Sequence, residues 1–359
     1  MITKEIHAAT TTPLALLEPS RTAWDAFVQA HPHGNLLQQS HWGELKAGFG
    51  WRVRHLAVCD GHGALLAGAQ LLLRSRYGLS LAYTPRGPLF ASAPAVNHLL
   101  LNGIIRVARR ARAIFLRLEP PLLEHDPQAD GFHTWLLLQG LHPAATIQPR
   151  SSIHVDLNQP EASLLANCSK GHRADIRRAE RNGVHVRVGS SSDLGTFQAI
   201  MEATGQRAGF AVHSAAYYQT AWQRFQPQAR LLLAELNGQT VAAHLVFADA
   251  HAGLYLYSGA AEAGLRSGAN HLLAWEAMRW ARSLGCSYYD LWGIPDALGR
   301  AVAAPDPATH AALEATAATD PLQGVYRFKK GFGGSVVRYL PAYDHVLLPP
   351  LYALALRSM

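Results

Sequence analysis

The sequence has 359 residues, of which 49% are hydrophobic and only 16% are charged. This composition excludes a disordered chain and suits two domains of about 150–180 residues each. The formal net charge is +7 with the 19 histidines counted as neutral, which favours anionic partners such as phosphates, nucleic acid or an acidic membrane surface.

The first half of the chain is predicted to form a hairpin, a third strand, a helix, a strand, a short helix and a final strand. Apolar runs on either side of an Asp60-Gly61 turn indicate the hairpin, and an apolar period near 3.6 indicates the first helix. The elements are expected at residues 52–58 and 64–73, 78–90, 98–112, 113–120, 134–143 and 145–157.

The second half repeats this order. Its elements are expected at residues 230–236 and 240–248, 252–260, 271–285, 286–295, 324–334 and 335–347. Asp60 and the turn residue Asn237 are 177 positions apart, and His98 and His271, which each begin an H-L-L helix, are 173 apart. Such close offsets favour a duplication. The order resembles the N-acyltransferase (GNAT-like) sheet, so the fold class is α/β (α+β), with two tandem GNAT-like domains and a cleft between them.

Between the two units, residues 160–184 are predicted to be helical. Spacings of three and four place several basic side chains on one face, and these either contact phosphate or RNA or form a solvated face. The basic candidates are Lys170, Arg173, Arg177 and Arg181. An Ala-rich segment at 297–320 is expected to be a mobile loop, either a lid or a plain linker.

The ends of the chain give no sign of a membrane span. No apolar run reaches the roughly 20 residues that a membrane helix needs, and the first residues lack the apolar core of a signal peptide. We therefore expect a cytoplasmic protein. The apolar stretch YDHVLLPPLYALALRSM is broken by Pro349 and Pro350, so we expect it to dock on a core, with peripheral contact to the inner membrane face as the alternative.

Several kinds of chemistry lack their motifs. No GxSxG, HExxH, Walker A or GxGxxG pattern is present, the histidines are scattered, and the three cysteines lie far apart. We therefore predict neither a metal site nor a bound cofactor. An acyl-CoA enzyme of this fold is expected to carry a (Q/R)xxGx(G/A) loop before its main helix, and the corresponding GLRSGANHLL at 264–273 fits only in part.

Nine stretches are distinctive when taken together: QQSHWGELKAGFGW, LAYTPRGPLF, FLRLEPP, ATIQPRSSIHVDL, ADIRRAERNGV, LYLYSGA, HLLAWEAMRWA, YYDLWGIP and YRFKKGFGG. On these stretches the chain resembles the Fem-type (FemABX) aminoacyltransferases over nearly its whole length. The resemblance implies a cytoplasmic enzyme that transfers an amino acid from aminoacyl-tRNA, without CoA or metal. The acceptor would be the third-residue side-chain amine of a peptidoglycan precursor, either UDP-MurNAc-pentapeptide or its lipid-linked form. No heptad run is present, so the chain resembles the armless, FemX-like type. The implied domains are 1–157 plus 341–359, which bind the precursor, and 158–340, which face the aminoacyl-tRNA.

The resemblance also implies site residues. Phe328 and Lys329 would face the tRNA acceptor end, with Lys330 beside them, and Glu119 would orient or deprotonate the amine. An aromatic ring can stack on a base, and a lysine can balance phosphate or an oxyanion. The implied precursor-binding residues are Lys46, Arg86, His213, Tyr217, Tyr255 and Tyr257.

His213 stands where many relatives have an arginine, and Tyr255 and Tyr257 are expected to point to one face of their strand. Trp42, Trp51, Trp275 and Trp292 are expected to be core residues. The alternatives are an acyltransferase that uses acyl-CoA or modifies another polysaccharide or peptide, and a protein that only binds aminoacyl-tRNA or precursor.

Overall fold

The computed structural model describes residues 13–357, which contain two seven-stranded sheets. In hydrogen-bonded order, the first sheet consists of β1 (Ala15–Leu17), β2 (Arg52–Cys59), β3 (Leu65–Arg76), β4 (Leu79–Thr84), β5 (Ala113–Leu118), β14 (Ala342–Val346) and β6 (His142–Ala144). The second consists of β13 (Ser335–Arg338), β7 (Ser151–Asp156), β12 (Tyr288–Asp290), β11 (Ala252–Ala260), β10 (Gln239–Ala248), β9 (Ala229–Leu236) and β8 (His185–Val188).

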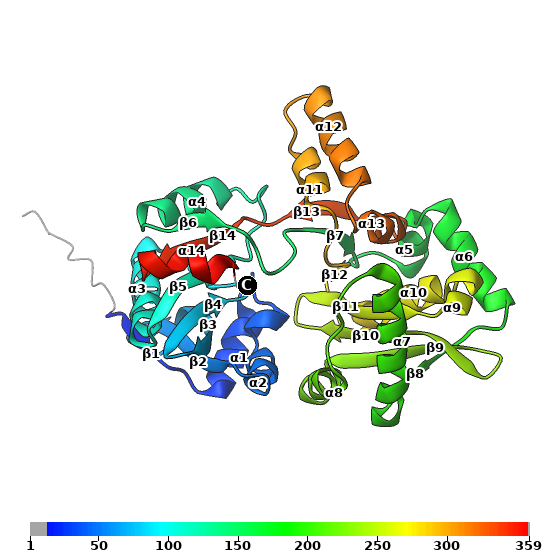
Figure 1. The fold of residues 1–359 in the computed structure, drawn as a ribbon, viewed down its shortest axis with the longest axis horizontal. Coiled ribbons are helices and arrows are strands. Elements are labelled where there is room, and N and C mark those ends of the chain that lie inside the picture. The colour runs from blue at the N-terminus through cyan, green and yellow to red at the C-terminus, as the bar shows by residue number, and fades with distance from the viewer. Residues whose placement is uncertain (1–12, 358–359) are drawn as a thin grey trace, which may run out of the picture.

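Figure 1 shows two lobes, and each lobe consists of one sheet and the helices that cover it. In the first half these are α1 (Arg21–Ala30), η1 (Leu36–Gln38), α2 (Ser40–Ala47), α3 (Pro94–Arg110), α4 (Ala129–Leu138) and α5 (Glu161–Asn167). The remainder are α6 (Lys170–Arg181), η2 (Ser191–Asp193), α7 (Leu194–Ala208), α8 (Ala215–Arg224), α9 (Glu262–Ser267), α10 (Ala269–Ser283), α11 (Asp296–Val302), α12 (Pro307–Ala318), α13 (Gln323–Lys330) and α14 (Pro349–Arg357).

The two sheets share one plan, which confirms the tandem GNAT-like fold. The hairpins β2–β3 and β9–β10 form at the predicted turns. Each hairpin leads to a third strand that pairs in parallel with the strand after the main helix, β4 with β5 and β11 with β12. The main helices α3 and α10 bury apolar faces spaced by three and four residues against their own sheets.

The last strand of each unit lies in the other unit's sheet. β7 pairs antiparallel with β12, and β14 pairs antiparallel with β5, and both are internal strands. The predicted boundary after residue 157 therefore differs from the observed arrangement, in which residues 151–156 belong to the second sheet. The alternating pattern of a strand predicts that it pairs, but not which of two similar sheets receives it.

A buried ion pair holds the exchanged strand β14 in place. Arg117 on β5 donates two hydrogen bonds to the Asp344 carboxylate, at 2.8 and 2.7 Å. Both side chains are almost completely buried, and the Tyr352 hydroxyl from α14 donates to the same carboxylate at 2.8 Å. The C-terminal segment therefore docks on the first sheet.

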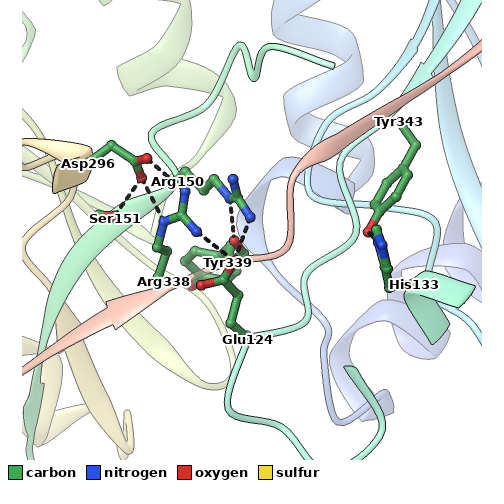
Figure 2. A network of polar contacts seen from close by, with 8 residues as sticks. All are labelled: Glu124, His133, Arg150, Ser151, Asp296, Arg338, Tyr339 and Tyr343. Carbon is green, nitrogen blue, oxygen red and sulfur yellow. Dashed lines mark hydrogen bonds and ion pairs between the residues drawn. The ribbon is translucent and has the colours of Figure 1, made fainter. Parts of the chain in front are cut away.

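The two crossing segments are also joined to each other. Arg150, just before β7, and Arg338, at the end of β13, both donate to Oε1 of Glu124, at 2.5 and 2.6 Å (Figure 2). Arg338 makes two further bonds to Asp296 at the start of α11, at 3.0 and 2.8 Å. Because these contacts join residues of the first domain to residues of the second, they restrain both crossings at one point.

The domains also share an apolar core. Leu36, Leu37 and Trp42 from the first domain pack in one cluster with Phe197 and Phe225 from the second. Such packing opposes free movement of one domain relative to the other.

The Ala-rich segment at 297–320 is helical, so the prediction of a loop was wrong. It contributes most of α11 and all of α12, which project from the molecule (Figure 1). Asp306 caps α12 by accepting a hydrogen bond from the Thr309 amide at 2.8 Å, and Pro307 begins the helix. Alanine's high helix propensity, together with this cap, accounts for the difference.

Candidate functional site

A cavity of about 350 Å³ lies between the two sheets. Its first-domain walls include Asn35, Leu37 and Arg86. Its second-domain walls come from β7, β11 and β12 and from the segments that follow β10, β12 and β13. These residues are His154, Asp249, His251, Leu254, Tyr288, Asp290, Trp292 and Tyr339. A cavity was predicted at this place, where both domains contribute side chains.

Arg86 and Trp292 shape one side of this cavity. The Arg86 guanidinium lies 3.5 Å from the centre of the Tyr339 ring and donates a hydrogen bond to the Pro149 carbonyl at 2.6 Å. Arg86 and Trp292 both have positive φ, +45° and +63°, which is unfavourable for large side chains. Trp292, predicted as a core residue, is half-buried and lines the cavity.

Lys329 lies directly behind this wall, near the end of α13. Its ammonium group donates to the carbonyls of Trp292 at 3.1 Å and Gly293 at 2.7 Å. Only 4% of the residue is exposed. Burial lowers the pKa of Lys329 to about 7, and the nearby charge of Asp290 opposes this effect. Lys329 therefore changes its charge near neutral pH.

Phe328 contacts aromatic rings of its own domain. Its ring centre lies 5.0 Å from that of His271 and 5.1 Å from that of Phe332, with His172 and Tyr255 slightly farther away. The ring is half-buried, so part of it is accessible. Stacking on a terminal base remains a prediction.

Tyr255 and Tyr257 point to opposite faces of the second sheet, so the prediction that they share one face was wrong. Leu245 lies opposite Tyr257, but Phe247 lies opposite Leu254, which leaves one extra residue on β11. This β-bulge reverses the alternation. As a result, Tyr255 packs with the helices that include Lys329, whereas Tyr257 packs with α7 and α8.

Four of the predicted precursor-binding residues form one cluster on the face of the second sheet toward the first domain. The Lys46 ammonium donates to the Tyr217 hydroxyl at 2.9 Å, and the Tyr257 hydroxyl lies 3.4 Å from the same oxygen. The His213 ring stacks on Tyr217 with 3.9 Å between centres. Burial, and then the charge of Lys46, lower the pKa of His213, which keeps it neutral at pH 7. Lys46 is therefore the permanent positive charge of the cluster.

Glu119 does not line the cavity. Its carboxylate accepts hydrogen bonds from the Tyr83 hydroxyl and from the amides of Ile147 and Gln148. Burial raises the pKa of Glu119, while the hydroxyl and amide bonds lower it. These contacts position the 145–149 segment. The role of Glu119 toward the amine stays a prediction.

The predicted basic face on α6 is only partly available to a ligand. Lys170, Arg177 and Arg181 are exposed. Arg173 instead donates to the carbonyls of Ala166 and Cys168, which end α5. Lys330 is exposed, with its ammonium 5.5 Å from the centre of the Tyr326 ring.

His154 and Asp290 also line the cavity and were not among the predicted site residues. Nε2 of His154 lies 3.5 Å from Oδ2 of Asp290. The available signal was a titratable side chain inside each of two predicted strands, His154 in SSIHVDL and Asp290 in CSYYDLWGIP. Within residues 13–357 there is no group of three or more His, Cys, Asp or Glu placed to hold a metal ion, and no helix is long and apolar enough to cross a membrane.

Comparison with known proteins places this fold and sequence in one family. The FemAB family model matches residues 20–240 and 238–356. The lipid II:glycine glycyltransferases of Staphylococcus saprophyticus and Staphylococcus aureus are each 28% identical, over 232 and 226 residues, which is 61% and 59% of this chain. The chain spans about half the length of these relatives, 55% and 53%.

The solved structures agree with the fold. A crystal structure of FemX aligns with a TM-score of 0.82 at 21% identity, covering 95% of this chain and 99% of that one. A tandem GNAT protein from the clavulanic acid pathway aligns with a TM-score of 0.53 at 11% identity, covering 93% of this chain and 98% of that one. From the family match over nearly its whole length, the chain belongs to the FemAB family.

Proposed function

We propose that the protein is a tRNA-dependent aminoacyltransferase that adds an amino acid to the third-residue side-chain amine in the stem peptide of a peptidoglycan precursor. The observation that carries this proposal is the placement of Lys329 directly behind the wall of a cavity built by both domains of a FemAB-family fold. The relatives are named for glycine transfer to lipid II, so glycyl-tRNA and a lipid-linked precursor are the first pair to test.

The chemistry requires little machinery. An aminoacyl ester is already activated, so the amine needs alignment, desolvation and loss of protons. Two N–H groups of the Lys329 ammonium are used by the Trp292 and Gly293 carbonyls, which leaves a third to stabilise the oxyanion formed at the ester carbonyl.

The two substrates would approach from opposite faces of the second sheet. Lys329 and Phe328 lie on the α10 face, and the Lys46 cluster lies on the other face. β11 and β12 pair over only three residue pairs, Ala252–Leu254 with Tyr288–Asp290. Because the strands do not pair beyond this point, the donor carbonyl and the acceptor amine can meet beside Trp292.

Acyl-CoA is less favoured as a donor because the loop before α10 is closely packed. Gly268 has φ of +86°, and a Cβ there would lie 2.4 Å from the Asp175 carbonyl oxygen on α6. At Gly264, a Cβ would lie 2.2 Å from the Val241 carbonyl oxygen. These glycines are explained by backbone packing, so they provide no evidence for a pyrophosphate cradle.

The proposal is tested by filter binding of charged and uncharged tRNA, followed by transfer of labelled amino acid to lipid II and to UDP-MurNAc-pentapeptide. Transfer that depends on charged tRNA supports the proposal. Binding without transfer would instead indicate a non-catalytic protein, and transfer from acyl-CoA without RNA would replace the proposed reaction with acyl-CoA chemistry.

Lys46→Ala is expected to raise KM for the precursor about 10-fold while kcat stays within twofold, because the lost charge serves binding of the precursor diphosphate rather than the reaction. Steady-state kinetics with varied precursor measure the split. Arg224→Ala, which removes an exposed arginine from the neighbouring α8, is the matched control and should leave both constants unchanged. An unchanged KM in the Lys46 variant would contradict the assignment.

A further inference from the structure

The cavity between the sheets contains a histidine–carboxylate pair that the residue assignments above do not use. His154 on β7 and Asp290 on β12 are directly opposite in the strand register, and both side chains line the cavity. Nε2 of His154 faces Oδ2 of Asp290 at 3.5 Å and the Tyr339 hydroxyl at 3.4 Å. The ring also stacks on Tyr288, with centres 4.4 Å apart. The imidazole is therefore held by contacts on several sides.

Asp290 is kept ionised at neutral pH. Burial by itself raises the pKa of Asp290, but the charge of His154, hydrogen bonds from His154 and Ser152, and the Trp292 amide at 2.7 Å together lower it to about 2. A fixed carboxylate beside an imidazole holds the ring in one orientation. This is the arrangement in which a third group orients a general base.

The His154 side chain is partly open to the cavity. Within residues 13–357, Nδ1 of His154 has no hydrogen-bond partner, and the side chain keeps 15% of its surface exposed. The cavity lining includes three carboxylates, Asp126, Asp249 and Asp290, against one guanidinium, that of Arg86. This balance favours entry of a cationic amine.

We propose that His154, oriented by Asp290, accepts a proton from the acceptor's side-chain amine in this cavity. The inference rests on the proposed function and deepens it. The same carboxylate acts electrostatically on Lys329, and the Trp292 backbone bonds to Asp290 through its amide and to Lys329 through its carbonyl. Asp290 and the Trp292 backbone therefore link His154, on the acceptor side, to Lys329, the predicted oxyanion-binding residue.

The reaction balances with one base. His154 takes one proton from the acceptor ammonium and later releases it to solvent, which leaves a neutral amine. The amine nitrogen forms a bond to the ester carbonyl carbon, and the bond from that carbon to the ribose oxygen breaks. The second proton moves from the attacking nitrogen to the departing ribose oxygen. The products are an amide, a free ribose hydroxyl and one released proton.

The test is the pH dependence of transfer in the full-length protein with the donor and acceptor identified above. In the wild type, we expect the rate to fall at acidic pH as the base becomes protonated. His154→Gln should lower kcat about 100-fold and remove this acidic limb, while the Kd for precursor measured by calorimetry stays within twofold. Imidazole added to His154→Ala should restore part of the rate.

Asp290→Asn tests the pair from the other side and covers the case in which His154 variants fail to fold. Loss of the carboxylate should lower kcat about 10-fold while the Kd for precursor stays within twofold, because the imidazole loses the group that orients it. The charged groups across the cavity, Arg86, Asp126 and Asp249, are unchanged in this variant, as are the nearby imidazoles of His33 and His251. Asp290→Asn also removes a charge near Lys329. That change affects the fall in rate at alkaline pH, which is assigned to Lys329 and is separate from the role of His154.

The control is His185→Gln, an exposed histidine on β8, which should behave as wild type. Two results would overturn the inference alone while the wild type still shows transfer: an unchanged rate and acidic limb in His154→Gln, or an unchanged kcat in Asp290→Asn. Absence of transfer by the wild type from any charged tRNA would overturn the proposed function, and the inference with it.

Discussion

Lys329→Met should lower the transfer rate at least about 100-fold, with little change in precursor binding. The substitution keeps the length of the side chain but removes the N–H group that we assign to the oxyanion, and loss of one such donor costs roughly 100- to 1000-fold in kcat. Single-turnover transfer from aminoacyl-tRNA measures the effect. In the wild type, the rate should fall above pH 7, because the pKa of Lys329 is about 7 and the protonated form is the active one.

Lys329→Met should also differ from the wild type in how its free energy of unfolding depends on pH. In the folded protein, burial lowers the pKa of Lys329 to about 7 from an ordinary 10.5. Between these pH values the unfolded chain binds a proton that the folded chain does not, so the wild type gains stability as pH rises. Relative to Lys329→Met, its free energy of unfolding should increase by about 1.4 kcal/mol per pH unit between pH 7 and 10, with no further change below 7.

Arg327→Met is the matched control, because Arg327 is an exposed basic residue of the same helix with no assigned role. It should show neither the loss of turnover nor the pH-dependent difference in stability. Near-normal turnover in Lys329→Met would remove the catalytic assignment. A stability difference that stays constant from pH 7 to 10 would show that the ammonium is not buried as described.

Asp344→Ala should destabilise the protein by about 3–5 kcal/mol, since the guanidinium of Arg117 loses its carboxylate partner in a buried place. The Tyr352 hydroxyl of α14 loses its acceptor as well. Urea denaturation followed by circular dichroism measures the change in the free energy of unfolding.

The comparison variant is Glu262→Ala, which breaks the exposed ion pair with Arg266 on α9. That pair is surrounded by water and its loss should have no measurable effect. Equal stability of the two variants would mean that the Arg117–Asp344 pair does not anchor the C-terminal strand. Hydrogen exchange would support the assignment most directly if amide protection were lost only in the C-terminal strand β14 and in α14.

The sequence predicted the local elements of the fold well, because turns and apolar periods depend on nearby residues. The Asp60-Gly61 and Asn237-Gly238 hairpins and the two main helices lie where these signals placed them. It did not predict that β7 joins the second sheet, because that choice depends on contacts between residues more than 130 positions apart, such as His154 and Asp290. The family resemblance did assign residues 341–359, which include β14, to the first domain.

The candidate site was predictable only where a motif carried it. Lys46, His213, Tyr217 and Tyr257 do come together, although they come from separate parts of the chain. The opposite orientation of Tyr255 follows from a bulge of one residue, which has no local signal in LYLYSGA. His154 and Asp290 were missed because strands joined by the exchange bring them together, and no spacing in the sequence expresses that.

The exchanged strands make each unit of the protein depend on the other for a complete sheet. Because β7 and β14 are interior strands, a fragment without its donated strand would have an open slot in the middle of its sheet. Neither unit can therefore be moved into another gene by itself without the strand that the other unit contributes. Two co-produced fragments split near residue 158 should instead find each other, because the first would hold β7 and the second β14, so that each completes the other's sheet.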